Sequence, residues 1–334
     1  MHEAKQKLKQ ITEEILFSRN DFGKQYSACN ELYKFFVGLT GVSHSSENAD
    51  DAGQTILPSG KAISPKEAAH CVLDFARTTQ FLRGIHAAIL ELKKRFPHKK
   101  LEILYAGCGP FAALMVPLLT QFTTEDFSLT LIDFHQRSID AARKIFAELS
   151  LENFVANFVR TDASNYKHKE KLHLVICETM QNAMKKEPQS AITLNLAPQL
   201  AENGIFVPQK ISVEVCLANL SKEFAADGAE KERIYLGEIL KLEAEKIRQS
   251  STQNFRFPAI TLEIPPMIVE KNVEKPNFML LTKVLIFGGF KLSERDSAIT
   301  YPQILNDLRD FSDNNRIEFT YILDKNPRFK YTQI

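Results

Sequence analysis

Two glutamates, Glu178 and Glu187, stand nine residues apart in the stretch CETMQNAMKKE, directly after an apolar run. On a regular helix this spacing would place them on opposite faces, so they converge only if the chain turns back between them. Two carboxylates brought together raise the pKa of one of them unless a cation lies between. If the chain does turn back, the two carboxylates form a site for a cationic group. Alternatively, Glu178 only ends a strand and Glu187 only begins a charged helix.

A second chemical feature is the glycine turn in LEILYAGCGPFAALMVPLL, residues 101–119. The apolar run gives way to Gly107 and Gly109 and then to an apolar helical pattern, which predicts a strand, a tight turn and a helix. Ligands of open parallel sheets bind beyond the carboxyl ends of the strands, where glycine lets the backbone approach a cofactor. Asp133 ends the next strand, LTLID, and is spaced to accept hydrogen bonds from two ribose hydroxyls. The turn therefore predicts a nucleoside-containing cofactor.

Two features favour a cofactor other than a dinucleotide. The turn lacks the third glycine of G-x-G-x-x-G and has Pro110-Phe111-Ala112 there instead. A third strand ends in Arg160-Thr161-Asp162-Ala163, an acid placed to meet an adenine amino group. In this order the motifs resemble those of the class I S-adenosylmethionine-dependent methyltransferases, although that family commonly has an acidic residue where this chain has Tyr105. The resemblance implies cofactor contacts at Gly107, Gly109, Asp133, Asp162 and Ala163.

The glutamate stretch resembles the double-glutamate loop of the protein arginine methyltransferases, in which E-x-M opens the loop and a second Glu closes it. Upstream, DFARTTQF at residues 74–81 resembles the D-x-x-R-T segment of the same family, whose arginine pairs with the cofactor's carboxylate. The resemblance implies that role for Arg77, with Asp74 orienting it. It also implies that Glu178 and Glu187 hold the methyl acceptor and that Met180 contacts it. The acceptor would be a guanidinium- or amine-bearing protein, peptide or small molecule.

One motif departs from that family. In place of its Thr-His-Trp motif this chain has Ile299-Thr300-Tyr301-Pro302, and it contains no tryptophan. Either the substrate differs from a peptidyl arginine, or Tyr301 fills the aromatic wall of the acceptor site without a histidine. A small-molecule or natural-product peptide N- or O-methyltransferase is therefore an alternative. The G-C-G-P turn also resembles that of nicotianamine synthases, which transfer an aminocarboxypropyl group. A non-catalytic dimeric scaffold is the alternative that is not an enzyme.

The elements that must position these residues can be traced from the apolar spacing. Residues 4–40 predict helices, and residues 41–64, rich in Ser, Asp, Asn and Gly, predict a mobile linker or a lid over the site. A capping pattern at Ser64 predicts a helix that continues to Pro97. Strands then alternate with helices, which predicts a doubly wound parallel sheet and hence an α/β fold.

After Gly204 the pattern changes to strands with few crossover helices, which predicts an antiparallel, barrel-like region. Residues 221–250 interrupt it with a composition and spacing that predict a helical insertion. Its apolar stripe needs a cover, either a second copy of the chain or the chain itself, so a homodimer is expected as one of two arrangements. The expected domains are an N-terminal helical region (1–98), a Rossmann-like cofactor domain (99–208) and a barrel-like substrate and dimerisation region (209–334).

The bulk composition argues against several classes of protein. The 334 residues include 42 Lys and Arg against 41 Asp and Glu, which gives no concentrated basic surface for nucleic acid. Five scattered cysteines without a C-x-x-C pair, and histidines without ligand spacing, argue against a disulfide framework and a metal site. No window reaches the ~20 apolar residues of a membrane span, and the first residues lack an apolar segment. A cytoplasmic protein that contacts neither nucleic acid nor membrane is therefore expected.

Overall fold

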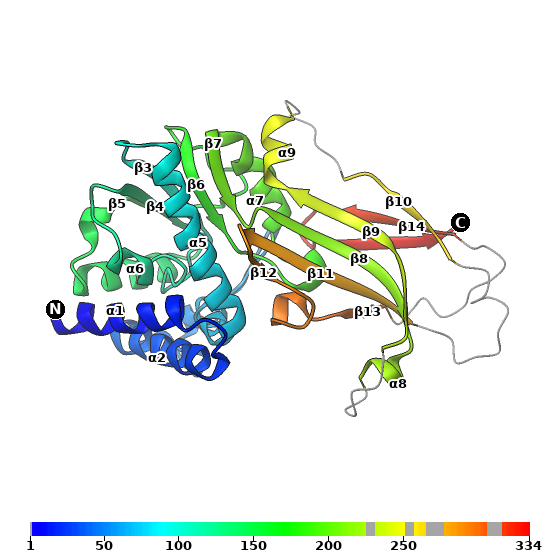
Figure 1. Cartoon of the computed structure of the whole chain (residues 1–334), viewed down its shortest axis with the longest axis horizontal. Coiled ribbons are helices and arrows are strands. Elements are labelled where there is room, and N and C mark those ends of the chain that lie inside the picture. Colours follow the sequence, from blue (N-terminus) through cyan, green and yellow to red (C-terminus); the bar gives the residue numbers. More distant parts are fainter. Residues whose placement is uncertain (1, 225–230, 251–256, 265–276, 306–315) are drawn as a thin grey trace.

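The computed structural model describes residues 2–224, 231–250, 257–264, 277–305 and 316–334. Figure 1 shows an α/β lobe that contains the N-terminus and a second lobe of long antiparallel strands that extends away from it. Among the described residues, no helix combines the length and the apolar character needed to cross a membrane.

A five-stranded parallel sheet forms the centre of the first lobe. Its strands are β3 (Leu101–Ala106), β4 (Phe127–Asp133), β5 (Val155–Arg160), β6 (Leu172–Cys177) and β7 (Leu200–Val207), in the order β5-β4-β3-β6-β7. Neighbouring strands all pair in parallel. The chain runs outward from β3 to β5 and then crosses to β6, so the strand order reverses between β3 and β6, where such sheets bind ligands. The predicted doubly wound sheet is confirmed.

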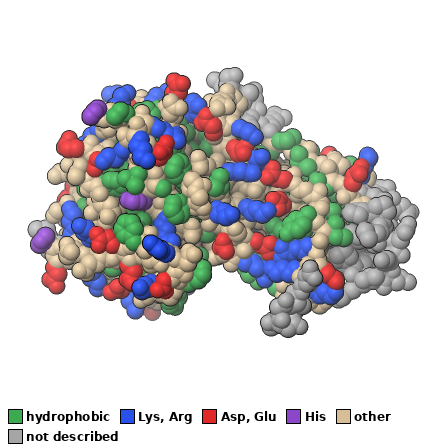
Figure 2. Space-filling view, viewed as in Figure 1, with side chains coloured by type: hydrophobic (Ala, Val, Ile, Leu, Met, Phe, Trp, Pro, Cys, Tyr) green, Lys and Arg blue, Asp and Glu red, His purple; other side chains and the backbone are tan. Residues whose placement is uncertain are grey.

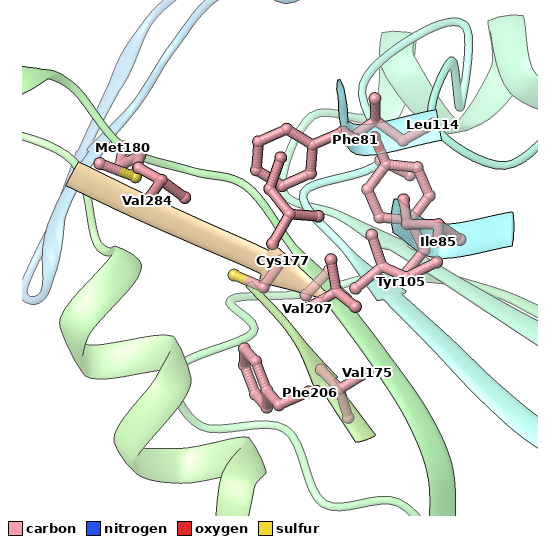
Figure 3. Packing of buried hydrophobic residues seen from close by; sticks show 14 of the residues in the cluster. Phe81, Ile85, Tyr105, Leu114, Val175, Cys177, Met180, Phe206, Val207 and Val284 are labelled. Atoms are coloured by element: carbon pink, nitrogen blue, oxygen red, sulfur yellow. The ribbon is translucent and has the colours of Figure 1, made fainter. Parts of the chain in front are cut away.

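Helices pack on this sheet or on one another beside it, and α5 (Phe75–Arg95) also contacts the second lobe. They are α1 (His2–Phe17), α2 (Phe22–Thr40), α5, α6 (Gln136–Glu148) and α7 (Gln189–Leu196). The α5 helix contacts β6 and β7 on one side and β11 and β12 of the antiparallel lobe on the other. Gly84 allows the close approach to β11, since a Cβ there would lie 2.4 Å from Ile286 Cγ2. Figure 3 shows Phe81 and Ile85 of α5 in the core with Tyr105 of β3 and Val207 of β7.

The helix expected after Ser64 is divided in the structure. The capping box at Ser64 forms as predicted and starts α4 (Pro65–His70), but a 3₁₀ turn, η1 (Cys71–Leu73), follows. The α5 helix then begins anew after Asp74, whose side chain accepts a hydrogen bond from the backbone N–H of Arg77 at 3.1 Å. An Asp before a helix is a strong N-cap. The continuous helix was predicted wrongly because the apolar spacing is the same on both sides of this cap.

Residues 41–64 hold regular structure rather than a mobile linker. The segment contains α3 (Ala49–Ala52) and an antiparallel hairpin of β1 (Thr55–Leu57) and β2 (Gly60–Ala62). The Pro58-Ser59-Gly60 turn is the sequence signal for this hairpin. Each strand has only three residues, too few to show an alternating apolar pattern.

The helix expected directly after the glycine turn is also absent. Residues 110–116 form consecutive turns, and only a short 3₁₀ helix, η2 (Pro117–Thr120), follows. Pro117 cannot donate a backbone hydrogen bond, and Ala112 adopts a positive φ of 43°, so a continuous α-helix cannot form. The turns still bury Phe111 and Leu114, which is why the apolar spacing resembled a helix.

The second lobe consists of antiparallel sheets, as predicted. One contains β8 (Lys210–Ala218), β9 (Arg233–Glu243), β11 (Asn277–Phe287), β12 (Phe290–Leu292) and β13 (Gln303–Leu305), and the other β10 (Ile260–Glu263), β14 (Arg316–Ile322) and β15 (Arg328–Gln333). On the face seen in Figure 2, basic and acidic side chains are interspersed over this lobe. One cross-strand pair of this kind joins Lys283 Nζ to Glu214 Oε2 at 2.7 Å.

The helical insertion expected at residues 221–250 is wrong for residues 233–243, which form a strand, whereas the two ends of the stretch are short helices. Residues 225–230 lie outside the described chain, the one-turn α8 (Leu220–Glu223) precedes them, and β9 and α9 (Ala244–Gln249) follow them. The whole of β9 pairs with β8, so long-range strand pairing outweighs the helical propensity of this stretch. The helical stripe that favoured a homodimer is therefore not formed in β9.

Candidate functional site

A cavity of about 400 Å³ lies at the carboxyl ends of β3, β4 and β6, at the switch point of the sheet. This volume is within the range of small-molecule and cofactor sites. Most of the residues singled out from the sequence line it: Arg77, Gly107, Gly109, Asp133, Asp162, Ala163, Glu178, Met180 and Glu187. The sheet therefore brings together, in one space, side chains that are more than 100 residues apart in the chain.

Asp133 is fixed by the backbone of the two turns beside it. The Gly109 N–H donates to Oδ2 at 2.8 Å, and the His135 N–H donates to Oδ1 at 2.9 Å. A carboxylate has about four acceptor positions, so each oxygen keeps one for a ligand. Because Asp133 is buried and lines the cavity, these positions are available to a pair of hydroxyl groups bound there.

The glycine turn lies directly against the beginning of the glutamate stretch. Gly107 has a φ of +69°, and a Cβ at this position would lie 2.4 Å from Thr179 Cγ2. Thr179 follows Glu178, so the close approach of this glycine helps to set where that carboxylate sits. Both the backbone angle and the space therefore require glycine.

We expect Gly107→Ala to lower the free energy of unfolding by about 1–3 kcal/mol, because alanine is strained at this φ and overlaps Thr179. The matched control is Gly38→Ala on α2, where nothing lies within 4 Å of an added Cβ. That change should be neutral or stabilising. Chemical unfolding of both variants is the measurement, and equal stability of Gly107→Ala and wild type would contradict the geometry.

Arg77 and Glu178 form a buried ion pair. Nη2 of the guanidinium binds Glu178 Oε2 closely, and Nη1 donates to the carbonyl of Cys71 at 3.2 Å. The side chains of Arg77 and Glu178 are only 10% and 4% exposed. Each charge has therefore lost most of its hydration, and the ion pair compensates for that loss. A guanidinium has five N–H donors, which leaves Arg77 able to bind a further carboxylate in the cavity that it lines.

Asp74 has a different part from the one expected. It caps α5, and its Oδ2 accepts hydrogen bonds from Ser297 Oγ at 2.7 Å and from the Ala298 N–H at 2.9 Å. Ala298 and Ile299 line the cavity. Asp74 therefore ties the antiparallel lobe to the helix of Arg77, rather than orienting the guanidinium itself.

The stretch between the two glutamates turns back on itself. Ala183, Met184 and Lys186 all have positive φ angles. Gln189 then closes the loop, because its Oε1 accepts from the Thr179 N–H at 2.9 Å and its backbone N–H donates to the Thr179 carbonyl at 3.2 Å. A chain that reverses in this way can present both of its glutamates to one cavity, and both line it.

The antiparallel lobe holds this loop from outside. Tyr321 of β14 donates its hydroxyl to the Met184 carbonyl at 2.7 Å, and Thr282 of β11 accepts from the Ala183 N–H at 2.8 Å. Figure 3 shows Met180 beside Val284 of β11. The position of the loop therefore depends on both lobes.

Glu187 is buried, and burial raises its pKa to about 7. A hydrogen bond from Gln181 and the charges of Lys61 and Arg77 act in the opposite direction without cancelling the effect of burial. A buried carboxyl with a pKa near neutrality can bind a cation or exchange a proton, which marks it as a candidate functional group.

Through Glu187, the stability of the ligand-free protein should depend on pH. The pKa is about 7 in the folded chain against 4.5 for an ordinary Glu, so the folded state binds this proton more tightly than the unfolded state. The resulting stabilisation is complete below about pH 4.5 and is lost as the pH rises through about 7. We therefore expect Glu187→Gln to gain stability relative to wild type between about pH 5 and pH 8, by a few kcal/mol at most. The measurement is thermal unfolding of both proteins at the two pH values. A difference in stability between Glu187→Gln and wild type that is the same at both would contradict the raised pKa of Glu187.

Tyr301 does not line the cavity. The residue is 47% exposed, the centroid of its ring lies 5.8 Å from the guanidinium carbon of Arg295, and its carbonyl accepts a hydrogen bond from Asn182 Nδ2 at 2.9 Å. Asp162 does line the cavity, and its Oδ1 accepts a hydrogen bond from the Ser164 N–H at 2.8 Å.

Tyr105 stands where class I methyltransferases commonly have an acidic residue. Its side chain is buried, and this burial raises the pKa of its hydroxyl, so a neutral phenol lines the cavity at this position.

One of the two expectations for residues 41–64 placed this segment over the site, but sequence reasoning singled out neither the lining residues of its hairpin nor His70. The hairpin contributes Leu57, Lys61 and Ala62, and α4 contributes His70. The turn at residues 58–60 predicts a hairpin, but nothing local in the sequence indicates where a hairpin will dock.

No protein-family model matches the sequence, and no curated protein matches it. Solved structures do share its fold. Protein Arginine Methyltransferase 10 of Arabidopsis thaliana, in a uniquely open conformation, matches with a TM-score of 0.50 and 9% identity, over 74% of this chain and 84% of that one. This chain has the protein arginine methyltransferase fold. A Trypanosoma brucei PRMT1 enzyme-prozyme heterotetrameric complex with AdoHcy is also similar, with a TM-score of 0.49 and 14% identity, over 75% of this chain and 86% of that one.

The fold match confirms the architecture that the motifs implied. In the protein arginine methyltransferase fold, as here, a Rossmann-like sheet is combined with antiparallel sheets and N-terminal helices. At 9% identity the match concerns the fold alone. The chemistry must be argued from the residues of the cavity.

Proposed function

We propose that the protein is an S-adenosylmethionine-dependent methyltransferase that transfers a methyl group to a nitrogen held by Glu178 and Glu187. One observation carries the proposal: a glycine turn, a fixed strand-end carboxylate and two buried glutamates line a single cavity at the switch point of the sheet. The name of the Arabidopsis fold neighbour, a protein arginine methyltransferase, adds support.

The residues of the cavity fit the cofactor. Asp133 keeps acceptor positions for two ribose hydroxyls, and Arg77 keeps donors for a carboxylate. Gly109 has a φ of +64°, and an added Cβ would lie 3.3 Å from the Ala68 Cβ, so glycine lets the turn pack closely against α4 at the edge of the cavity. Asp162 and Ala163 would hold the adenine. When bound, the cofactor supplies an electrophilic methyl group.

The charges of the lining favour a cationic ligand. The lining carboxylates outnumber the lining cations, which are Lys61 and Arg77; the carboxylates are Asp74, Asp133, Asp162, Glu178 and Glu187. A cavity that carries an excess of one charge concentrates ligands of the opposite charge. Both a sulfonium cofactor and a guanidinium or ammonium acceptor meet this requirement.

The two glutamates would orient the acceptor by charge-assisted hydrogen bonds. A carboxylate on each side fixes the plane of a guanidinium and turns one nitrogen towards the methyl carbon. Transfer would form the nitrogen–carbon bond as the carbon–sulfur bond breaks, and Glu187 would take the proton that leaves the nitrogen, because burial raises its pKa. The rate would come mainly from alignment and from exclusion of water.

A small-molecule or peptide natural-product acceptor is the second candidate. The observation that favours it is the place of Tyr301, which stands where the family has its Thr-His-Trp motif but does not line the cavity. An acceptor site without that aromatic wall suits a ligand other than a peptidyl arginine. Homodimer formation stays a prediction.

Incubation with methyl-labelled S-adenosylmethionine and a cell lysate, split into protein and metabolite fractions, tests the proposal. We expect label on a guanidinium- or amine-bearing product that has gained one methyl group, and the fraction that contains it separates the two candidates. A product that has gained an aminocarboxypropyl unit instead would show an aminocarboxypropyl transferase, as the resemblance to nicotianamine synthases implies. No labelled product in either fraction would contradict the proposal.

A further inference from the structure

The β1–β2 hairpin is bonded to two separate segments of the chain that line the cavity or adjoin its lining. At its first strand, Thr55 Oγ1 hydrogen-bonds Nε2 of His135, directly before α6, at 3.3 Å. At its second strand, the Lys61 N–H donates to the carbonyl of Lys186 at 2.7 Å. Lys186 precedes Glu187, so the hairpin is bonded to the backbone that carries the second glutamate.

Gly60 brings the hairpin into contact with the same backbone. Its φ is +143°, and an added Cβ would lie 2.8 Å from Pro188 N, 2.9 Å from the Glu187 carbonyl carbon and 2.9 Å from Lys186 O. These are all backbone atoms, which cannot rotate out of the way as a side chain can. The hairpin can therefore lie this close to Glu187 only with glycine at position 60.

Lys61 adds a positive charge on the Glu187 side of the cavity. Titratable groups that act on Glu187 come from several elements: Lys61 of β2, Glu67 of α4, Cys71 of η1, Arg77 of α5 and Cys177 of β6. Burial raises the pKa of both thiols, so they are neutral, and Arg77 is paired with Glu178. Lys61 is thus a second cation of the cavity lining whose charge acts on Glu187, and it lies outside the Arg77–Glu178 ion pair.

We propose that the hairpin forms part of the acceptor site, where Gly60 positions the backbone of Glu187 and Lys61 selects acceptors with a single positive charge over polycationic ones. The inference rests on the proposed function in one respect, the assignment of Glu187 to the acceptor. Its physical basis is that a cation of the chain already acts on each glutamate, Arg77 on Glu178 by direct contact and Lys61 on Glu187 by its charge. A second positive charge on the acceptor would meet the Lys61 ammonium and be repelled.

The first test uses Lys61→Met, with Lys66→Met on the neighbouring α4 as the matched control. Carboxyl-labelled NMR of the full chain follows the titration of Glu187, and methylguanidinium serves as the cationic probe. We expect Lys61→Met to raise the pKa of Glu187 and to bind methylguanidinium roughly 3- to 10-fold more tightly. Lys61→Arg should restore wild-type values, and Lys66→Met should keep them.

A second test compares acceptors of different charge. Lys61→Met should bind a peptide with several arginines more tightly by a larger factor than it binds methylguanidinium. If Lys61→Met and Lys66→Met give the same titration of Glu187 and the same affinities, the role of Lys61 is overturned.

Gly60→Ala tests the positioning role, with Gly53→Ala in the same segment as its control. Gly53 has a negative φ and nothing within 4 Å of an added Cβ. We expect Gly60→Ala to weaken methylguanidinium binding at least roughly 10-fold while S-adenosylmethionine affinity stays within about 3-fold of wild type. Unchanged probe binding in Gly60→Ala would refute the role of Gly60, and if that variant does not fold, the Lys61 measurements decide.

These readouts separate the hairpin inference from the proposed function. A shifted Glu187 titration in a protein that does not bind S-adenosylmethionine would keep the hairpin contact and refute methyl transfer. Methyl transfer that is indifferent to both hairpin variants would refute only the hairpin inference.

Discussion

Glu178→Gln should reduce methyl transfer by at least about 1000-fold while S-adenosylmethionine still binds. A neutral amide cannot balance the charge of the acceptor, so the nitrogen loses both its orientation and its counter-charge, effects that together are worth several kcal/mol. Cofactor affinity should be retained or increased, because Asp133 and the glycine turn are untouched and Arg77 is freed to bind the cofactor's carboxylate.

The same substitution should destabilise the ligand-free protein. It leaves the buried Arg77 guanidinium without its partner, a loss worth roughly 3–5 kcal/mol. The carboxylate of the bound cofactor can replace that partner, so the cofactor should raise the unfolding temperature of Glu178→Gln more than that of wild type. Glu263→Gln is the matched control, because its ion pair with Arg316 is exposed and should contribute about 0–1 kcal/mol.

Single-turnover transfer, calorimetric cofactor binding and thermal unfolding measure these effects. Loss of cofactor affinity together with transfer would contradict the acceptor role of Glu178. Full transfer activity in Glu178→Gln would contradict it equally.

Asp133→Ala should weaken S-adenosylmethionine binding by roughly 100-fold or more. The change removes the acceptor for two ribose hydroxyls and leaves the N–H groups of Gly109 and His135 without the carboxylate they now bind. Two charge-assisted hydrogen bonds of about 1.5–3 kcal/mol each account for a loss of this size. The S-adenosylmethionine affinity of Asp133→Asn should lie between those of wild type and Asp133→Ala, since the amide retains one acceptor oxygen.

The control for this prediction is Asp140→Ala on α6. Its carboxylate is exposed and accepts a hydrogen bond from Gln136 Nε2 at 2.8 Å, away from the cavity lining. Isothermal titration of the cofactor into all four proteins is the measurement. Equal affinities of Asp133→Ala and Asp140→Ala would show that the strand-end carboxylate does not hold the cofactor.

The parallel sheet could be predicted because its signals are local. Buried parallel strands such as β3 and β6 are short, nearly continuous apolar runs, and each is followed by a polar or glycine-containing turn. The turn at Gly107, the acid at Asp133 and the glutamate stretch all follow such runs. Strand ends of a parallel sheet meet at one edge, so these residues were expected to meet in one site, and they line one cavity.

The remaining features depend on long-range contacts that a sequence pattern does not contain. The helix-forming composition of residues 233–243 was overridden by pairing with β8. Asp74 caps α5 and bonds Ser297, more than 200 residues away, so its role depends on how the lobes pack. The docking of the hairpin on Glu187 is of the same kind. Backbone contacts between segments distant in the chain determine where the hairpin docks. Gly60 is the one residue in the hairpin sequence that reflects these contacts, because an added Cβ there would meet backbone atoms.

A crystal structure of the full chain with bound S-adenosylmethionine would show whether this cavity is a methyltransferase site. We expect the two ribose hydroxyls on the Asp133 carboxylate, the cofactor carboxylate on Arg77, and the sulfonium methyl facing the space between Glu178 and Glu187. An adenosyl group bound elsewhere, or a methyl group turned away from both glutamates, would contradict this expectation.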